Sequence, residues 1–344
     1  MNTKLPLLPT SVVGSYGSPS WLLTALGEIE AGRYGETDRS ETFDDAVRLA
    51  MLDQERAGVD IISDGELRRS GFFHGFYPRF AGLDPLPPRR RVGLPSYDTQ
   101  ERWRVRERLG VPRGLGIVEE FTFARAHTSK PLKVACPGPL TFTILLELND
   151  VYPHHFAAAE EIAPAVNAEL RALVAAGADF IQIDEPSFVT MPGELTEWVR
   201  LFNRVVEGVQ AKIALHVCFG NLGSRPRGKR TWRRIFPALL EARVDQFVLE
   251  FANREMSEIE LWKEWGSDKE LGAGLVDVKS CYIERPEDVA ERIRQALRYV
   301  APEKLTVNPD CGFLAMPRWI AYRKLVAMVQ GTRLVRRELT GREE

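Results

Sequence analysis

The 344-residue chain is predicted to be an α/β protein, a (β/α)8 TIM barrel with an inserted cap or hairpin after strand two. Eight short β-rich runs alternate with helical stretches, and several runs are continuously apolar, as in parallel strands buried on both faces. Polar residues gather where these runs end. The runs are SVVGS (11–15), DIISD (60–64), LKVAC (132–136), FIQID (180–184), IALHV (213–217), FVLEF (247–251), GAGLVDV (272–278) and KLTVNP (304–309).

Three helices carry clear end signals. Gly58 closes DDAVRLAMLDQERAG and Gly177 closes APAVNAELRALVAAG, each just before a strand, as expected of a glycine in the left-handed cap position. Pro286 opens RPEDVAERIRQALRYV and is followed by acidic residues, which suit a first helical turn. The alternation predicts one barrel domain spanning residues 1–344 rather than two domains.

Two segments interrupt the alternation. Residues from about 82 to 125 are rich in proline and charge, and we expect a hairpin or cap over the barrel mouth there. GNLGSRPRGKRTWRR (220–234) follows the fifth strand. Its basic residues are either a solvated loop or a contact for an anionic substrate.

Composition excludes several classes of function. Lys and Arg number 46 against 48 Asp and Glu, so the net charge of −2 does not favour nucleic acid or an anionic membrane as partner. The start MNTKLPLLPT lacks the apolar core of a signal peptide. Four cysteines do not form a disulfide framework, so we expect a reducing cytoplasm with free thiols.

Four metal-ligand residue types lie just past the strand ends. They are His216 and Cys218 in LHVCFGN, Glu250 in QFVLEF and Cys311 in VNPDCGF. One imidazole, one carboxylate and two thiols suit zinc, and their spread over about a hundred residues indicates a catalytic site at a barrel mouth rather than a zinc finger. Cys136 and Cys281 also fall near strand ends. They could replace one of these ligands, but we expect them to be small buried hydrophobic residues.

Two further acids, Glu66 and Asp184, follow the second and fourth strands. They are either a general acid–base pair or acceptors for an ammonium group. Ser15 lies in the glycine-bearing loop GSYGSP, whose backbone N–H groups can receive a carboxylate. Together these residues predict an amino-acid site. The alternative for Glu66 is an ion pair with Arg68 or Arg69.

These segments resemble the catalytic domain of cobalamin-independent methionine synthase, in its short single-barrel form. The matching motifs occur in family order: LPTSVVGSYGSP, DIISDGELRRSGFF, ACPGPLTFT, DFIQIDEPS, LHVCFGN, FVLEF, GAGLVDVKS and VNPDCGF. The resemblance implies one zinc ion per chain, held by His216, Cys218, Glu250 and Cys311. It also implies that Glu66 and Asp184 hold the ammonium of homocysteine and that Ser15 helps hold its carboxylate.

Two departures from the family concern the methyl donor. Leu145 stands where the family has a Trp that stacks on folate, and Lys279, in DVKSC, replaces a His implicated in proton delivery to the folate leaving group. The resemblance as a whole implies that homocysteine is methylated to methionine, and we expect Asp184 and Lys279 to take part in catalysis. The donor is methylcobalamin, free or on a corrinoid protein, or else methyltetrahydrofolate.

Two alternatives stay open. One is another alkyl transfer to a zinc thiolate, such as epoxide opening by coenzyme M, although coenzyme M has no ammonium for Glu66 and Asp184 to bind. The other is a zinc-binding homologue without catalytic activity. The sequence makes no prediction of oligomeric state.

Overall fold

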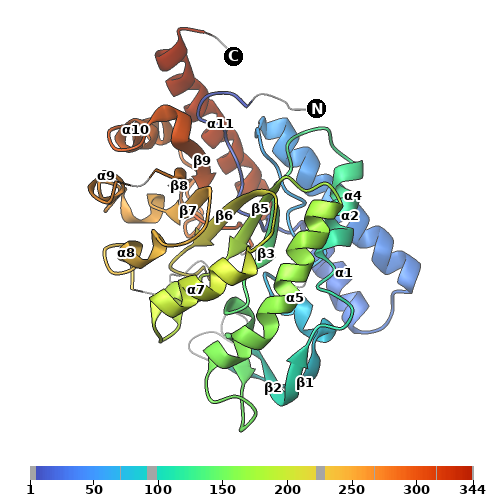
Figure 1. Ribbon diagram of the computed structural model, residues 1–344. Coiled ribbons are helices and arrows are strands. Elements are labelled where there is room, and N and C mark those ends of the chain that lie inside the picture. Colours follow the sequence, from blue (N-terminus) through green and yellow to red (C-terminus); the bar gives the residue numbers. More distant parts are fainter. Residues whose placement is uncertain are drawn as a thin grey trace.

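The structure is a computed structural model that describes residues 5–69, 71–90, 99–221, 229–266, 268–314 and 316–342 (Figure 1). Its centre is a parallel sheet of six strands in the order β3-β5-β6-β7-β8-β9. Every crossover passes through an intervening segment that includes a helix, which is the pattern of consecutive βα units. The strands are β3 (Val134–Pro137), β5 (Phe180–Asp184), β6 (Lys212–Val217), β7 (Gln246–Glu250), β8 (Glu270–Val276) and β9 (Leu305–Pro309).

Three isolated parallel bridges close this sheet into a ring. Thr10 pairs with Val307 of β9, Ser11 pairs with Ile61, and Ile62 pairs with Leu132 just before β3. The predicted eight-membered barrel order is therefore confirmed. Its first two members each make two isolated bridges rather than forming the predicted extended strands, because each segment turns away within a few residues, at Gly14 and at Gly65.

Long helices surround the ring (Figure 1). Gly58 and Gly177 follow the ends of α2 and α5 with φ angles of 87° and 98°, and Pro286 is the first residue of α10, as the end signals predict. The longer helices are α1 (Ser20–Glu30), α2 (Glu36–Ala57), α4 (Ile117–Ala126), α5 (His155–Ala175), α7 (Leu195–Val205), α10 (Pro286–Leu297) and α11 (Arg318–Thr340). Short turns of helix are α6 (Ser187–Thr190), α8 (Phe236–Leu239), α9 (Leu261–Glu264), η1 (His74–Arg79), η2 (Thr141–Thr143), η3 (Ala252–Arg254) and η4 (Pro302–Lys304).

The segment between the second and third barrel positions contains an antiparallel hairpin, seen at the bottom of Figure 1. Its strands are β1 (Ala81–Arg90) and β2 (Thr99–Gly110), and β2 also pairs with β4 (Leu146–Glu147), which follows β3. The inserted segment was expected to end at about residue 125, but it ends earlier. Residues 117–126 form α4, the crossover helix that leads into β3. In the second interruption, residues 222–228 lie outside the described part of the chain.

The barrel interior holds its own small apolar cluster of Val13, Ile61, Phe180, Ala214 and Val248. These side chains point inward from different strands, and they are separate from the larger core between the barrel and its helices. This cluster forms a floor on which side chains nearer the strand ends are stacked. Among the described residues, no helix combines the length and the apolar character that crossing a bilayer requires.

Candidate active site at the strand ends

Alternation along the strands places the predicted site residues above the interior cluster. Side chains two apart on a strand share a face. Ser15, His216 and Glu250 each lie two residues beyond an inward-facing member of the cluster, and Asp184 lies four residues beyond Phe180. All four are therefore directed into the barrel at its carboxyl end, and all four are buried.

His216, Cys218 and Cys311 converge at this end, with their ligand atoms all within 4.8 Å of one another. The sulfur atoms of Cys218 and Cys311 are 3.7 Å apart. The two loops that carry them are tied together, since the amide Nδ2 of Asn221 donates to the carbonyl O of Gly312 at 2.9 Å. The chain thus brings together three of the four predicted zinc ligands from β6 and β9.

The donor atoms of this group suit a metal ion. Nδ1 of His216 lies 3.1 Å from the carbonyl O of Val248, and Nε2 is buried without a hydrogen-bond partner among the described residues. Such an arrangement selects the tautomer that presents the Nε2 lone pair to a metal. The pKa of the Cys311 thiol lies well below its ordinary value. The hydrogen bond between Cys311 and Cys218 and the charge of His216 lower this pKa, whereas burial acts to raise it.

Glu250 ends β7, and its side chain is fully buried. Its Oε2 accepts from Nζ of Lys279 at 2.8 Å and from the backbone N–H of Phe219 at 3.2 Å. Its Oε1 has no partner among the described residues. Glu250 is not a member of the group within 4.8 Å, so its predicted place as a fourth ligand stays a prediction.

Asp310, directly before Cys311, positions the loop after Glu250. Its carboxylate accepts from the backbone N–H groups of Phe251 and Ala252 at 2.9 Å and of Asn253 at 2.7 Å. Asp310 lies in the motif VNPDCGF, and no role is predicted for it from the sequence. An acid after a buried strand indicates only that its carboxylate accepts hydrogen bonds in a loop. The three donors of Asp310 could not be predicted, because they belong to the loop after β7, in another βα unit of the barrel.

Glu66 and Asp184 lie close enough for the charge of Asp184 to raise the pKa of Glu66. Oε1 of Glu66 accepts from Arg69 at 3.0 Å, with both side chains buried, and Oε2 accepts from the hydroxyl of Ser15. Oδ1 of Asp184 accepts from the amide Nε2 of Gln182 at 2.7 Å. The ion pair considered for Glu66 therefore forms with Arg69, whereas Arg68 pairs with Asp44.

Burial dominates the ionisation of both acids. It raises the pKa of Glu66 to about 8, although the charge of Arg69 opposes this. It raises the pKa of Asp184 to about 6, against the lowering effect of His216. A cation placed between the two carboxylates would favour their ionised forms, so the pair is suited to receive a positive group.

One buried base inside the barrel was not predicted. The side chain of Lys133 is buried, and Nζ lies 5.6 Å from the ring centroid of Phe180 and has no hydrogen-bond partner among the described residues. Burial lowers the pKa of Lys133 to about 7, while the charge of Asp184 opposes this. A lysine within an otherwise apolar strand is the available signal, since the pattern LKVAC by itself indicates only a buried strand.

The remaining strand-end residues have structural surroundings. Cys136 is fully buried, as expected, but Cys281 is exposed, so the expectation of a buried side chain is wrong there. Cys281 lies in the loop between β8 and α10, beyond the apolar part of the strand. Leu145 is buried, and its carbonyl O accepts from the backbone N–H of Trp103 on β2 at 3.2 Å.

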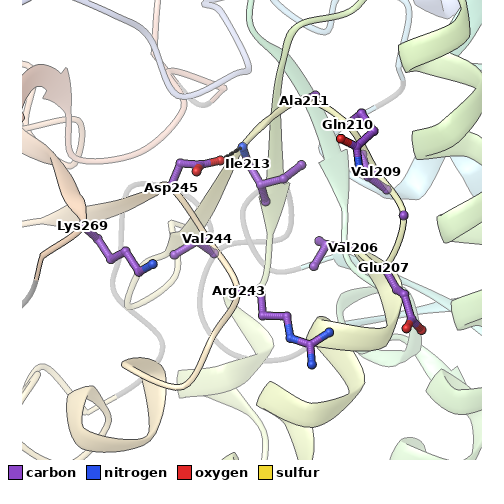
Figure 2. Close-up of a pocket in the computed structure, with 11 residues that line it drawn as sticks. Val206, Glu207, Val209, Gln210, Ala211, Ile213, Arg243, Val244, Asp245 and Lys269 are labelled. Carbon is purple, nitrogen blue, oxygen red and sulfur yellow. Dashed lines mark hydrogen bonds between the residues drawn. The ribbon is translucent and has the colours of Figure 1, made fainter.

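A surface cavity of about 490 Å³ lies at the opposite end of the barrel (Figure 2). Residues that precede β6, β7 and β8 line it, including Ala211, Asp245 and Lys269. None of the predicted site residues lines this cavity. It therefore takes no part in the arrangement at the carboxyl ends of the strands.

Comparison with known proteins agrees with these motifs. The family model described as "Cobalamin-independent synthase, Catalytic domain" matches residues 8–333. A methionine synthase of Saccharolobus islandicus is 39% identical over 98% of this chain and 97% of its own length, and one of Saccharolobus solfataricus is 38% identical over the same shares. A B12-independent methionine synthase from Shewanella sp. W3-18-1, solved in complex with selenomethionine, superimposes with a TM-score of 0.83 at 30% identity, covering 98% of this chain and 100% of that one.

Proposed function

We propose that this chain methylates the thiol of homocysteine to give methionine. The chain belongs to the cobalamin-independent synthase catalytic-domain family and is thus a methyltransferase of the methionine synthase type. The observation that carries the proposal is the group of His216, Cys218 and Cys311 at the same end of the barrel as Asp184. Soft donors for a metal and acceptors for an ammonium are the two features that activation of an amino-acid thiol requires.

The amino-acid end of the substrate is assigned to Asp184, Glu66 and Ser15. The buried carboxylate of Asp184 attracts the ammonium. Glu66, held by Arg69, is a second acceptor beside it, and a bound ammonium would favour its ionised form over the neutral form that burial favours. Ser15 and the backbone around it would receive the carboxylate. The Shewanella relative was solved with selenomethionine, an amino acid of the shape of the expected product, which supports a site of this kind.

His216, Cys218 and Cys311 would hold one zinc ion, with Glu250 as the expected fourth group. When bound there, zinc lowers the pKa of a nearby thiol, so that it reacts as a thiolate at neutral pH. In the reaction the thiol loses its proton to water, and the sulfur lone pair forms a bond to the methyl carbon. The bond from that carbon to the donor breaks, and its electron pair leaves with the donor.

A corrinoid is the proposed methyl donor. Leu145, at the position where the family has a folate-stacking Trp, is buried and hydrogen-bonded to the hairpin through its carbonyl. Lys279, in place of a His, is engaged in an ion pair with Glu250. A cobalt-centred leaving group needs no proton, so neither residue has to serve folate chemistry.

The test is a methionine-formation assay with the purified, zinc-loaded protein and homocysteine. Methylcobalamin is compared with mono- and polyglutamyl methyltetrahydrofolate, and Cys311→Ala is the inactive control. Methionine from methylcobalamin alone is the expected result. Turnover only with folate would overturn the donor assignment. Turnover with coenzyme M and an epoxide, but not with homocysteine, would overturn the acceptor.

A further inference from the structure

Asp53, on α2, is a buried acid that binds two side chains from loops far apart in the sequence. Its Oδ2 accepts from the hydroxyl of Tyr16 at 3.1 Å and from Nε of Arg318 at 2.7 Å, and its Oδ1 accepts from Nη2 of Arg318 at 2.8 Å. Only 4% of the Asp53 side chain is exposed. A buried carboxylate needs partners that offset its desolvation, so the three side chains form one connected unit.

Tyr16 directly follows Ser15, the residue assigned to the substrate carboxylate. The backbone N–H of Tyr16 donates to the carbonyl O of Gly65, the residue before Glu66, at 2.9 Å. The Tyr16 side chain is buried, and its ring packs edge-on against Phe313 with the ring centroids 6.3 Å apart. Because its hydroxyl is held by α2, Tyr16 fixes one side of the Ser15 loop.

Arg318 fixes the other side of the same loop. It is the first residue of α11, at the end of the loop after β9. A Cβ atom at Gly17 would lie 2.7 Å from the carbonyl O of Met316 and 3.0 Å from Cα of Arg318, so the two backbones are in direct contact there. The backbone N–H of Phe313 also donates to the carbonyl O of Ser15 at 2.7 Å. Holding Arg318 in place therefore supports the Ser15 loop.

We infer that Asp53 is a positioning residue that, through Tyr16 and Arg318, holds the Ser15 loop in the conformation that receives the carboxylate of the amino-acid substrate. A hydroxyl and backbone N–H groups would bind that carboxylate, and the loop conformation sets the directions in which they point. A loop supported from both sides has these groups aligned before the substrate arrives, which lowers the cost of binding. This inference rests on the proposed function, because it takes the same loop to be the carboxylate site.

The test measures binding of methionine, the expected product, to the full chain by titration calorimetry, so that neither turnover nor the methyl donor affects the result. The second ligand is 3-(methylthio)propylamine, which is methionine without its carboxylate, and its affinity is obtained from its displacement of methionine. We expect Asp53→Asn and Arg318→Gln to weaken methionine binding about tenfold, because the loop no longer holds its donors in line with the carboxylate. The affinity for 3-(methylthio)propylamine should stay at the wild-type value.

Three further variants sharpen the comparison. Tyr16→Phe removes one hydroxyl and keeps the ion pair, so it should have a smaller effect on methionine alone. Asp53→Asn combined with Arg318→Gln should bind methionine no more weakly than Asp53→Asn does, since both changes act through one ion pair. Arg294→Gln is the matched control, because it breaks an exposed ion pair with Glu338 between α10 and α11 and should change the affinity for neither ligand.

The proposed function and this inference fail in different ways. A wild-type chain that does not bind methionine overturns the proposed function and the inference with it. A wild type that binds methionine, with variants that bind it equally well, overturns only the role of Asp53. Equal weakening of both ligands also overturns that role, because it indicates a general loss of structure. If Asp53→Asn does not fold, Arg318→Gln and Tyr16→Phe provide the same comparison, since the Arg318 side chain is 37% exposed and Tyr16→Phe keeps the buried ring.

Discussion

Nδ1 of His216 lies 3.1 Å from the carbonyl oxygen of Val248, a residue on the neighbouring strand of the barrel. This contact occupies Nδ1 and leaves Nε2, which is buried and has no partner among the described residues, available for the group with the two cysteine sulfurs. A backbone group of the barrel thus orients the ring in the way that binding of a metal through Nε2 would require.

The wild-type protein is expected to contain about one zinc ion per chain, and His216→Ala or Cys311→Ala should remove most of it, because losing one of three close donors weakens binding strongly. Metal content after gel filtration, measured by mass spectrometry, checks this. Cys136→Ala is the matched control, since Cys136 is a buried free thiol outside the group. Full zinc retention in both ligand variants would refute the assignment.

Asp184→Asn should raise the KM for homocysteine by tenfold or more and leave zinc content near that of the wild type. The reason is that a neutral amide loses the charge attraction to a buried ammonium, and such charged hydrogen bonds are worth about 1.5–3 kcal/mol. The control is 4-mercaptobutyrate, a thiol without the amino group. If the variant lost activity equally on both thiols, Asp184 would have no ammonium role.

The same carboxylate predicts a pH dependence. Burial raises the pKa of Asp184 to about 6, so the fraction that is ionised, and able to bind the ammonium, falls as the pH drops through that value. The ratio of the KM for homocysteine to that for 4-mercaptobutyrate should therefore rise below about pH 6. Thiol ionisation affects both substrates and cancels in the ratio. A ratio that stays flat in the wild type, as expected for Asp184→Asn, would contradict the prediction.

Asp310→Asn should destabilise the site and the fold together. The carboxylate accepts from three backbone N–H groups, and the amide NH₂ of Asn cannot accept, so at least one buried donor loses its partner at a cost of about 1–3 kcal/mol. We expect a lower melting temperature and weaker zinc retention, measured by calorimetry and chelator competition. Asp150→Asn, at an exposed position, is the control and should change neither.

Much of the architecture follows from local patterns. Gly58, Gly177 and Pro286 mark helix ends by the backbone angles that they allow or impose, and these ends are confirmed. The apolar runs predict strands, and the alternation predicts the barrel. The first two strands are shorter than expected. Their length was not predictable, because the apolar character of a run indicates that it is buried but not how many backbone hydrogen bonds it makes with neighbouring strands.

The grouping of His216, Cys218 and Cys311 was predictable because parallel barrel strands end on the same face, so residues about a hundred positions apart meet there. The sequence by itself therefore determined the barrel, the family and the residue types at its mouth. Only the tertiary structure decided that Glu250 pairs with Lys279 and that Glu66 pairs with Arg69. Such pairings depend on which side chains from separate loops are buried next to one another. Each buried charge forms an ion pair with a neighbouring opposite charge, which offsets the cost of its desolvation.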